Sequence, residues 1–112
     1  MTKHFAMIAM TMLVAAGALI AAPARADTTI SITVKNHRFQ PAEVHAPANI
    51  PIILKVKNLD STAMEFESVS LRVEKVVTPG SEGIIRLRPL APGSYNFFDD
   101  FHQETNGVLV VK

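Results

Sequence analysis

Residues 92–111 read PGSYNFFDDFHQETNGVLVV, and this stretch decides how the chain folds. The Pro92-Gly93 pair is typical of a turn. Aromatic and β-branched residues then dominate residues 95–98 and 108–111, and such residues favour strands. A polar segment rich in carboxylates lies between these two runs. The stretch therefore predicts two paired core strands joined by a polar loop.

The rest of the chain shows the same pattern of short strands. Ile30, Ile32 and Val34 alternate with polar residues, which is the period of two expected of a half-buried strand. Further strand candidates follow, separated by turn residues. They cover residues 43–46, 52–57, 64–68, 71–77 and 84–87. The sequence therefore predicts an all-β antiparallel sandwich of seven or eight strands. An immunoglobulin-like sandwich is the alternative, but a chain without Cys or Trp lacks the Cys and Trp core of that class.

The first 26 residues have a different character. An apolar run at residues 5–22 is followed by Ala24-Arg25-Ala26, the small-x-small pattern of a signal peptidase site. We therefore expect a cleavable signal peptide at residues 1–26, a single domain at residues 27–112, and export to the periplasm. An uncleaved membrane anchor is the alternative interpretation of the apolar run.

The expected mature domain has little net charge and no cysteine. Without Lys3 and Arg25 the chain keeps 9 of its 11 Lys and Arg residues against 10 Asp and Glu, a net charge of −1. This balance gives no basic patch for nucleic acid. Because disulfides are excluded, stability must come from core burial or from a bound metal.

Several segments resemble cupredoxins in their order and spacing. The resemblance covers nearly all of the expected mature domain and implies a Greek-key β-sandwich. The segments that carry it are Ile32-x-Val34, Phe39-x-Pro41-x-x-Val44, Val56-Lys57-Asn58, Met64-Glu65-Phe66, and the two Pro-Gly turns at residues 79–80 and 92–93.

The resemblance also places three of the four residues that bind copper in a type 1, or blue, cupredoxin. Met64 stands where the first His would be, Asp99 where the Cys would be, and His102 where the second His would be. The fourth ligand, a Met, has no counterpart. Because a type 1 site requires a thiolate beside two imidazoles, we expect no blue copper site.

A closer resemblance is to the cupredoxin-like domains of bacterial iron-uptake systems, of the EfeO and FtrB types. It rests on Met64-Glu65-Phe66-Glu67, on Leu71-x-x-Glu74-Lys75, and on Phe98-Asp99-Asp100-Phe101-His102. The resemblance implies binding of copper or iron and assistance to ferrous iron oxidation or uptake. It also implies two partners, a periplasmic iron-binding protein and a membrane iron permease.

The loop between the last two strands holds four candidate metal ligands, Asp99, Asp100, His102 and Glu104. Carboxylates together with imidazole suit Fe, Mn, Zn or Cu(II). In an extended segment Asp100, His102 and Glu104 share one face and Asp99 lies on the other. The resemblance to cupredoxins implies that a turn after Asp99 can bring its carboxylate toward His102, as the Cys-to-His spacing does in that family. The alternative is a solvated acidic loop without a metal.

Two further candidates, Glu65 and Glu67, flank Phe66. A period of two places both carboxylates on one face, and Phe66 on the core face. Their repulsion predicts either a shared cation or a neighbouring base, with Lys75 or Arg72 as that base. The alternative is an ordinary pair of surface glutamates.

His37 and Met64 complete the predicted ligand set. The alternatives are a surface position for His37 and core packing for Met64.

The sequence contains no evident Ser–His–Asp arrangement and no phosphate-binding glycine loop, so any redox step would be metal-based. Two other functions stay open: a metal-free cupredoxin-fold interaction module, and a periplasmic copper chaperone.

Overall fold

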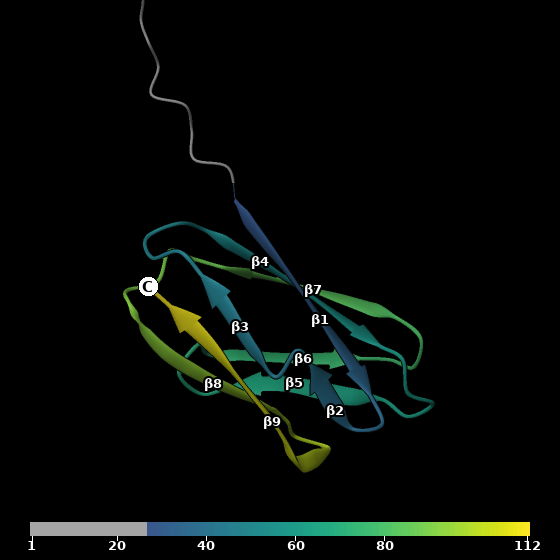
Figure 1. The fold of residues 1–112 in the computed structure, drawn as a ribbon. Helices are drawn as coiled ribbons and strands as arrows, with labels where there is room; N and C mark the ends of the chain where they lie inside the picture. Colours follow the sequence, from purple (N-terminus) through teal and green to yellow (C-terminus); the bar gives the residue numbers. More distant parts are fainter. Residues whose placement is uncertain (1–26) are drawn as a thin grey trace, which may run out of the picture.

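The computed structural model describes residues 27–112, so the predicted signal peptide at residues 1–26 lies outside the described residues. The described chain forms strands joined by turns and loops (Figure 1). The strands are β1 (Thr28–Lys35), β2 (Arg38–Gln40), β3 (Glu43–Ala46), β4 (Ile52–Asn58), β5 (Met64–Ser68), β6 (Val73–Val77), β7 (Glu82–Leu87), β8 (Gly93–Asp99) and β9 (His102–Val111). Between residues 27 and 112 no helix is long and apolar enough to cross a membrane.

The nine strands form two packed sheets, with the orders β2-β1-β4-β7 and β3-β9-β8-β5-β6. The predicted all-β sandwich is confirmed. It has one or two more strands than expected, and both sheets are mixed, because β1 pairs with β4 and β3 pairs with β9 in parallel. Alternation of polar and apolar residues looks the same in parallel and antiparallel strands, so the pattern did not reveal these two pairs.

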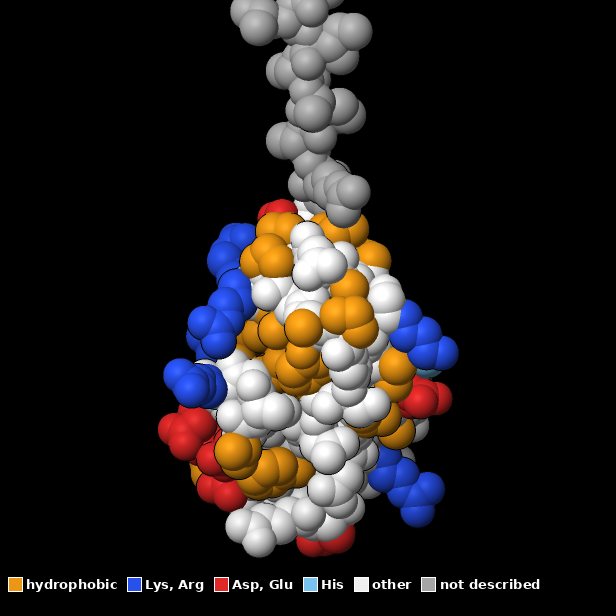
Figure 2. All heavy atoms as spheres, turned by 90° about the vertical axis from the view of Figure 1, so that its left-hand side faces the viewer, with side chains coloured by type: hydrophobic (Ala, Val, Ile, Leu, Met, Phe, Trp, Pro, Cys, Tyr) orange, Lys and Arg blue, Asp and Glu red, His pale blue; other side chains and the backbone are white. Residues whose placement is uncertain are grey.

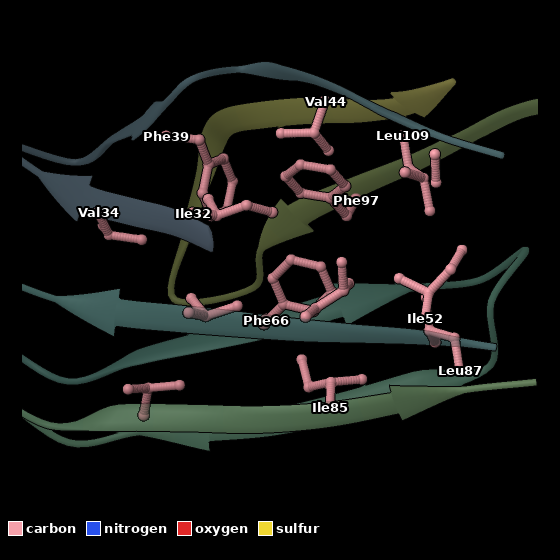
Figure 3. Packing of buried hydrophobic residues seen from close by; sticks show 14 of the residues in the cluster. Ile32, Val34, Phe39, Val44, Ile52, Phe66, Ile85, Leu87, Phe97 and Leu109 are labelled. Atoms are coloured by element: carbon pink, nitrogen blue, oxygen red, sulfur yellow. The ribbon is translucent and has the colours of Figure 1, made fainter. Parts of the chain in front are cut away.

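The core lies between the sheets and is built from the alternating inward residues of both. Phe39, Phe66 and Phe97 form its aromatic centre, with ring centroids 4.9–6.1 Å apart (Figure 3). Phe97 also contacts the backbone of β9, where a Cβ built on Gly107 would lie only 2.3 Å from the Phe97 ring. A side chain at residue 107 would therefore collide with the aromatic centre.

Three connections meet at one end of the sandwich. They are the β1–β2 turn, the β4–β5 loop and the β8–β9 turn, which lie together at the lower right of Figure 1. Asn58 ties the β4–β5 loop to the body of the fold. It is fully buried, its Nδ2 donates to the carbonyls of Thr62 and Val77, and its Oδ1 accepts from the backbone N–H of Asp60. Nearly all the predicted ligands lie at or near this end.

Candidate metal centre

The first element of the site is the Asp99–His102 pair. Asp99 is opposite Phe66 in the β5–β8 ladder, and opposed residues share a face, so its side chain points toward the core and is fully buried. Its Oδ1 accepts hydrogen bonds from the backbone N–H groups of Glu65 and Phe101, each at 3.0 Å. Its Oδ2 lies 2.8 Å from Nδ1 of His102. Both carboxylate oxygens of Asp99 are therefore already engaged, and one of them orients His102.

The tight turn between β8 and β9 explains why these two residues meet. Asp99 and His102 oppose each other across the turn. The hydrogen bond from the Phe101 N–H back to Asp99 is the Asx-turn interaction that Asp favours. The Asp100 N–H donates to the Glu65 carbonyl at 2.9 Å, which fixes the turn against β5. The turn expected after Asp99 is thus present, whereas the role of either residue as a metal ligand stays a prediction.

The second element is the two-residue turn that carries His37. Asn36 and His37 both have positive φ, 54° and 56°, which is the geometry of a type I′ hairpin turn. Asp60 accepts hydrogen bonds from both backbone N–H groups, at 2.6 Å from Asn36 and 2.9 Å from His37. On the other side, the Thr105 hydroxyl donates to the His37 carbonyl at 2.5 Å. The backbone of His37 is therefore held from both directions.

The two histidines contact each other. The ring centroids of His37 and His102 are 4.0 Å apart, with 31° between the ring planes. Nδ1 of His37 lies 3.6 Å from Oδ2 of Asp60. Each imidazole thus has a carboxylate beside its Nδ1, Asp60 for one ring and Asp99 for the other.

The third element is a cluster of carboxylates on the outer face of the second sheet. One ligand oxygen each from Glu65, Glu67 and Asp100 lie within 4.8 Å of one another. Met64, Phe66 and Ser68 are buried, so the alternating glutamates face outward as the sequence predicted. Figure 2 shows acidic side chains gathered along one edge of the lower half of the face that it displays, beside exposed hydrophobic side chains.

The carboxylate cluster has an unfavourable electrostatic environment. Partial burial raises the pKa of Glu65, and the carboxylates of Asp100, Glu74 and Asp99 raise it further. Partial burial also raises the pKa of Glu67, with additional contributions from Asp100, Glu74 and Glu65. The charged form of each glutamate is therefore disfavoured, which is the condition that a bound cation would relieve.

The two bases predicted as an alternative, Lys75 and Arg72, form no ion pair with these glutamates, although Arg72 lines a pocket with Glu67 and Glu74. The residue opposite Glu67 on β6 is Glu74, and Lys75 is opposite Phe66, whose side chain points to the core. Within residues 27–112, neither Glu65 nor Glu67 forms an ion pair with Lys or Arg. Like charges face each other across the β5–β6 ladder at Glu67 and Glu74 instead.

Two predicted residues lie apart from these groups. Met64 is fully buried in the core, where its packing fits the alternative interpretation. Glu104 is exposed on β9 and lines a pocket of about 180 Å³ with His37, Arg38 and Thr105 rather than joining Asp100. The predicted set is therefore divided among the histidine pair, the outer carboxylates and these two separate positions.

Sequence reasoning missed Asp60 and Thr105, which hold the His37 turn. Both lie in segments that were considered only as loop or strand. Asn58-x-Asp60 directly after a strong strand is a signal that was available, since Asn and Asp side chains commonly organise the backbone that follows a strand. Nothing local to Thr105 indicated its contact with a residue on β1–β2.

Comparison with known proteins gives the family. The Cupredoxin-like domain model matches residues 4–111, and the chain belongs to that family. A curated relative, an uncharacterized protein of Rickettsia prowazekii (strain Madrid E), is 45% identical over 83 residues, which are 73% of this chain and 66% of the relative. The chain thus spans about two thirds of that protein.

Solved structures of the same fold are more distant in sequence. The metal-binding domain of the Cu(I)-exporting P-type ATPase CopA of Streptococcus pneumoniae superposes with a TM-score of 0.69 at 17% identity, covering 79% of this chain and 88% of that domain. Auracyanin A, a blue copper protein of Chloroflexus aurantiacus, superposes with a TM-score of 0.65 at 12% identity, covering 78% of this chain and all of that one. At such identities the likeness shows the fold alone.

Proposed function

We propose that the protein is a periplasmic metal-binding accessory of iron uptake, which binds copper or iron through carboxylate and histidine ligands. The observation that carries the proposal is the cluster of Glu65, Glu67 and Asp100 beside the Asp99–His102 pair. A thiolate-based copper site is excluded, because the chain has no cysteine.

The donor set fits hard and borderline metal ions. Three half-buried carboxylates with ligand atoms within 4.8 Å suit Fe(III), and carboxylate oxygens also bind Cu(II). A bound ion would supply positive charge to glutamates whose ionised form the protein disfavours. Copper is also the metal in the structural relatives named above, a Cu(I)-bound domain and a blue copper protein.

The role in iron uptake rests on the resemblance to iron-uptake cupredoxin domains. In that role the protein would work in the periplasm with a periplasmic iron-binding protein and a membrane iron permease. A metal held at the end of a rigid sandwich, on an exposed face, is accessible to such partners. The redox capacity would belong to the metal, while the protein supplies its ligands.

The test is calorimetric titration of the purified metal-free protein with Cu(II) and with Fe(III), together with absorption spectra. We expect binding near one or two equivalents without an intense blue band. Glu67→Gln should weaken binding at the carboxylates, whereas Glu43→Gln, an exposed carboxylate on another strand, should leave it unchanged. Absence of binding by both ions would refute the proposal and favour a metal-free interaction module.

The uptake role needs a separate experiment. Deleting the gene in the source organism should lower uptake of radioactive ferrous iron, and the wild-type gene should restore it. The Glu67→Gln gene should restore it less well than Glu43→Gln. Unchanged uptake in the deletion strain, with metal binding intact in vitro, would reject the iron role and leave a copper chaperone as the better explanation.

A further inference from the structure

Outside the carboxylate cluster, the contact between His37 and His102 brings together two side chains that can bind a metal ion. The two rings come from the β1–β2 turn and the start of β9, and their centroids are 4.0 Å apart. Two imidazoles at this separation offer two nitrogen donors in one place. The carboxylate cluster is not required for this arrangement.

Each ring has a carboxylate near its Nδ1, and for His102 that carboxylate is within hydrogen-bond distance. A carboxylate beside Nδ1 keeps the proton on that nitrogen and leaves the lone pair on Nε2. For His102 this carboxylate is the fully buried Asp99, at 2.8 Å. For His37 the neighbouring carboxylate is that of Asp60, which lies 3.6 Å from Nδ1, beyond hydrogen-bond distance, with 14% of its side chain exposed. Histidines that bind metals through one nitrogen are almost always oriented in this way through the other.

Asn36 and His37 both have positive φ, a conformation in which Asn, Asp and His are the most common residues after Gly. The turn is held through backbone groups, by Asp60 on one side and Thr105 on the other. The imidazole contacts the His102 ring and lies near Asp60, it also lines a pocket with Glu104 and Thr105, and the side chain is 46% exposed.

The two groups of ligands lie on different faces of the same sheet. Asp99 shares the core face with Phe66 and reaches His102 from inside the sandwich. Glu65 and Glu67 alternate with buried residues and face outward. The strand between them separates the imidazole pair from the carboxylate cluster.

We propose that His37 and His102 form a two-imidazole site for a divalent transition metal ion, with Asp60 and Asp99 as the carboxylates that orient the rings. Cu(II) is the ion expected to bind best, since divalent affinity for nitrogen ligands peaks at copper, and Zn(II) is a weaker alternative. The site is separate from Glu65, Glu67 and Asp100. This proposal rests on the proposed function only in that both require the protein to bind a metal ion. It requires neither iron nor the outer carboxylates.

The decisive experiment counts imidazoles bound to Cu(II). The full chain is expressed, freed of metal, loaded with one equivalent of Cu(II), and examined by pulsed electron paramagnetic resonance. Wild-type protein should show two coordinated imidazoles. His37→Asn should show one, with Cu(II) affinity at least about tenfold lower; Asn suits a positive φ, so the variant should fold.

The chain supplies a matched control in His45. This histidine also has a carboxylate nearby, with Nε2 of His45 3.8 Å from Glu43, but it lies exposed on β3 away from the pair. His45→Asn should keep two imidazoles and wild-type Cu(II) affinity. If His37→Asn retains two imidazoles, or if His45→Asn loses one, the proposal is wrong.

A second measurement avoids substitutions. Nitrogen chemical shifts of the three mature histidines are followed by NMR as Zn(II) is added to wild-type protein. Nε2 of His37 and of His102 should shift together, while His45 should not respond. Chemical-shift changes at His102 alone would refute the proposal that both histidines bind the metal ion. If Glu67→Gln loses Fe(III) binding but Cu(II) still coordinates two imidazoles, the two-imidazole site is independent of the carboxylate cluster.

Discussion

The buried carboxylate of Asp99 joins Nδ1 of His102 to the backbone N–H of Glu65, which lies 34 residues earlier in the chain. One side chain therefore links His102, at the end of the sandwich, to the strand that carries the outer glutamates. In a blue copper protein the resemblance would place a metal-binding thiolate at this position. Here the residue organises its neighbours through three hydrogen bonds.

Replacing Asp99 by Asn should reverse the tautomer of His102. The amide oxygen can still accept from Glu65 and Phe101, which leaves the amide N–H₂ facing Nδ1. Nδ1 must then act as the acceptor, so the proton moves to Nε2. Two-dimensional NMR of the imidazole nitrogens should show Nδ1–H in wild type and Nε2–H in the variant. Asp99→Ala, which leaves all three donors without an acceptor, should lower the free energy of unfolding by about 3 kcal/mol.

Asp60 should contribute to stability in a pH-dependent way. Partial burial raises its pKa, but the hydrogen bonds from His37 and Asn36 and the nearby histidines outweigh this, and the net pKa lies below 3.8. A carboxyl with a lowered pKa in the folded state stabilises the protein above its unfolded pKa. That stability is lost as the pH falls below about 3.8 through the folded pKa.

Asp60→Asn should accordingly be less stable by about 1–2 kcal/mol at neutral pH, and the difference should shrink in acid. Urea unfolding at pH 7 and at successively lower pH values measures both effects. Glu43→Gln serves as the control, because that carboxylate is exposed and should contribute little. If the free energy of unfolding of Asp60→Asn is lower than that of the wild type by the same amount at all pH values, the ionised carboxylate does not have the assigned role.

Glu67→Gln should stabilise the metal-free protein at neutral pH. The pKa of Glu67 is raised above 4.5, so the folded state disfavours its charged form. This destabilisation is fully present above the folded pKa, and it fades as the pH falls through that pKa toward 4.5. Thermal unfolding should therefore show a higher midpoint for the variant at pH 7 and converging midpoints in acid. Adding a bound metal should reverse the order, since the wild type then gains a ligand.

Gly107→Ala should destabilise the fold without touching any ligand. The added methyl would lie 2.3 Å from the Phe97 ring and 2.9 Å from the Ala42 carbonyl, so the aromatic centre or β9 must shift. Overpacking of this kind costs about 1–3 kcal/mol. Gly93→Ala is the matched control, because its nearest neighbours in the Tyr95 ring lie at an ordinary 3.7 Å. Chemical denaturation measures the free energy of unfolding of both variants. Equal values would contradict the prediction and show that β9 shifts to accommodate the methyl group at little cost.

Local patterns predicted much of the fold and part of the site. Alternation identified β1, apolar runs between turn residues identified β4 and β7, and the run from Pro92 to Val111 identified the final hairpin. The same period of two placed Glu65 and Glu67 on one outward face, as the structure shows. The resemblance to cupredoxins suggested a turn after Asp99 that brings its carboxylate toward His102, and the two side chains do meet.

Other features depend on which strands become neighbours. Asp100 joins the two glutamates only because β8 lies beside β5. His37 meets His102 only because the β1–β2 turn and the β8–β9 turn reach the same end of the sandwich. Asp60 enters the site from a loop that gave no sign of its two backbone partners.

Residue type and a short-range period specify the strands, the faces of their side chains and the exclusion of a thiolate copper site. The contact between His37 and His102, with carboxylates from different segments beside them, arises only in the folded chain. The physical reason is that a strand's alternation specifies which face a residue occupies, whereas the partner across that face is set by sheet order and by the parallel β1–β4 and β3–β9 pairings.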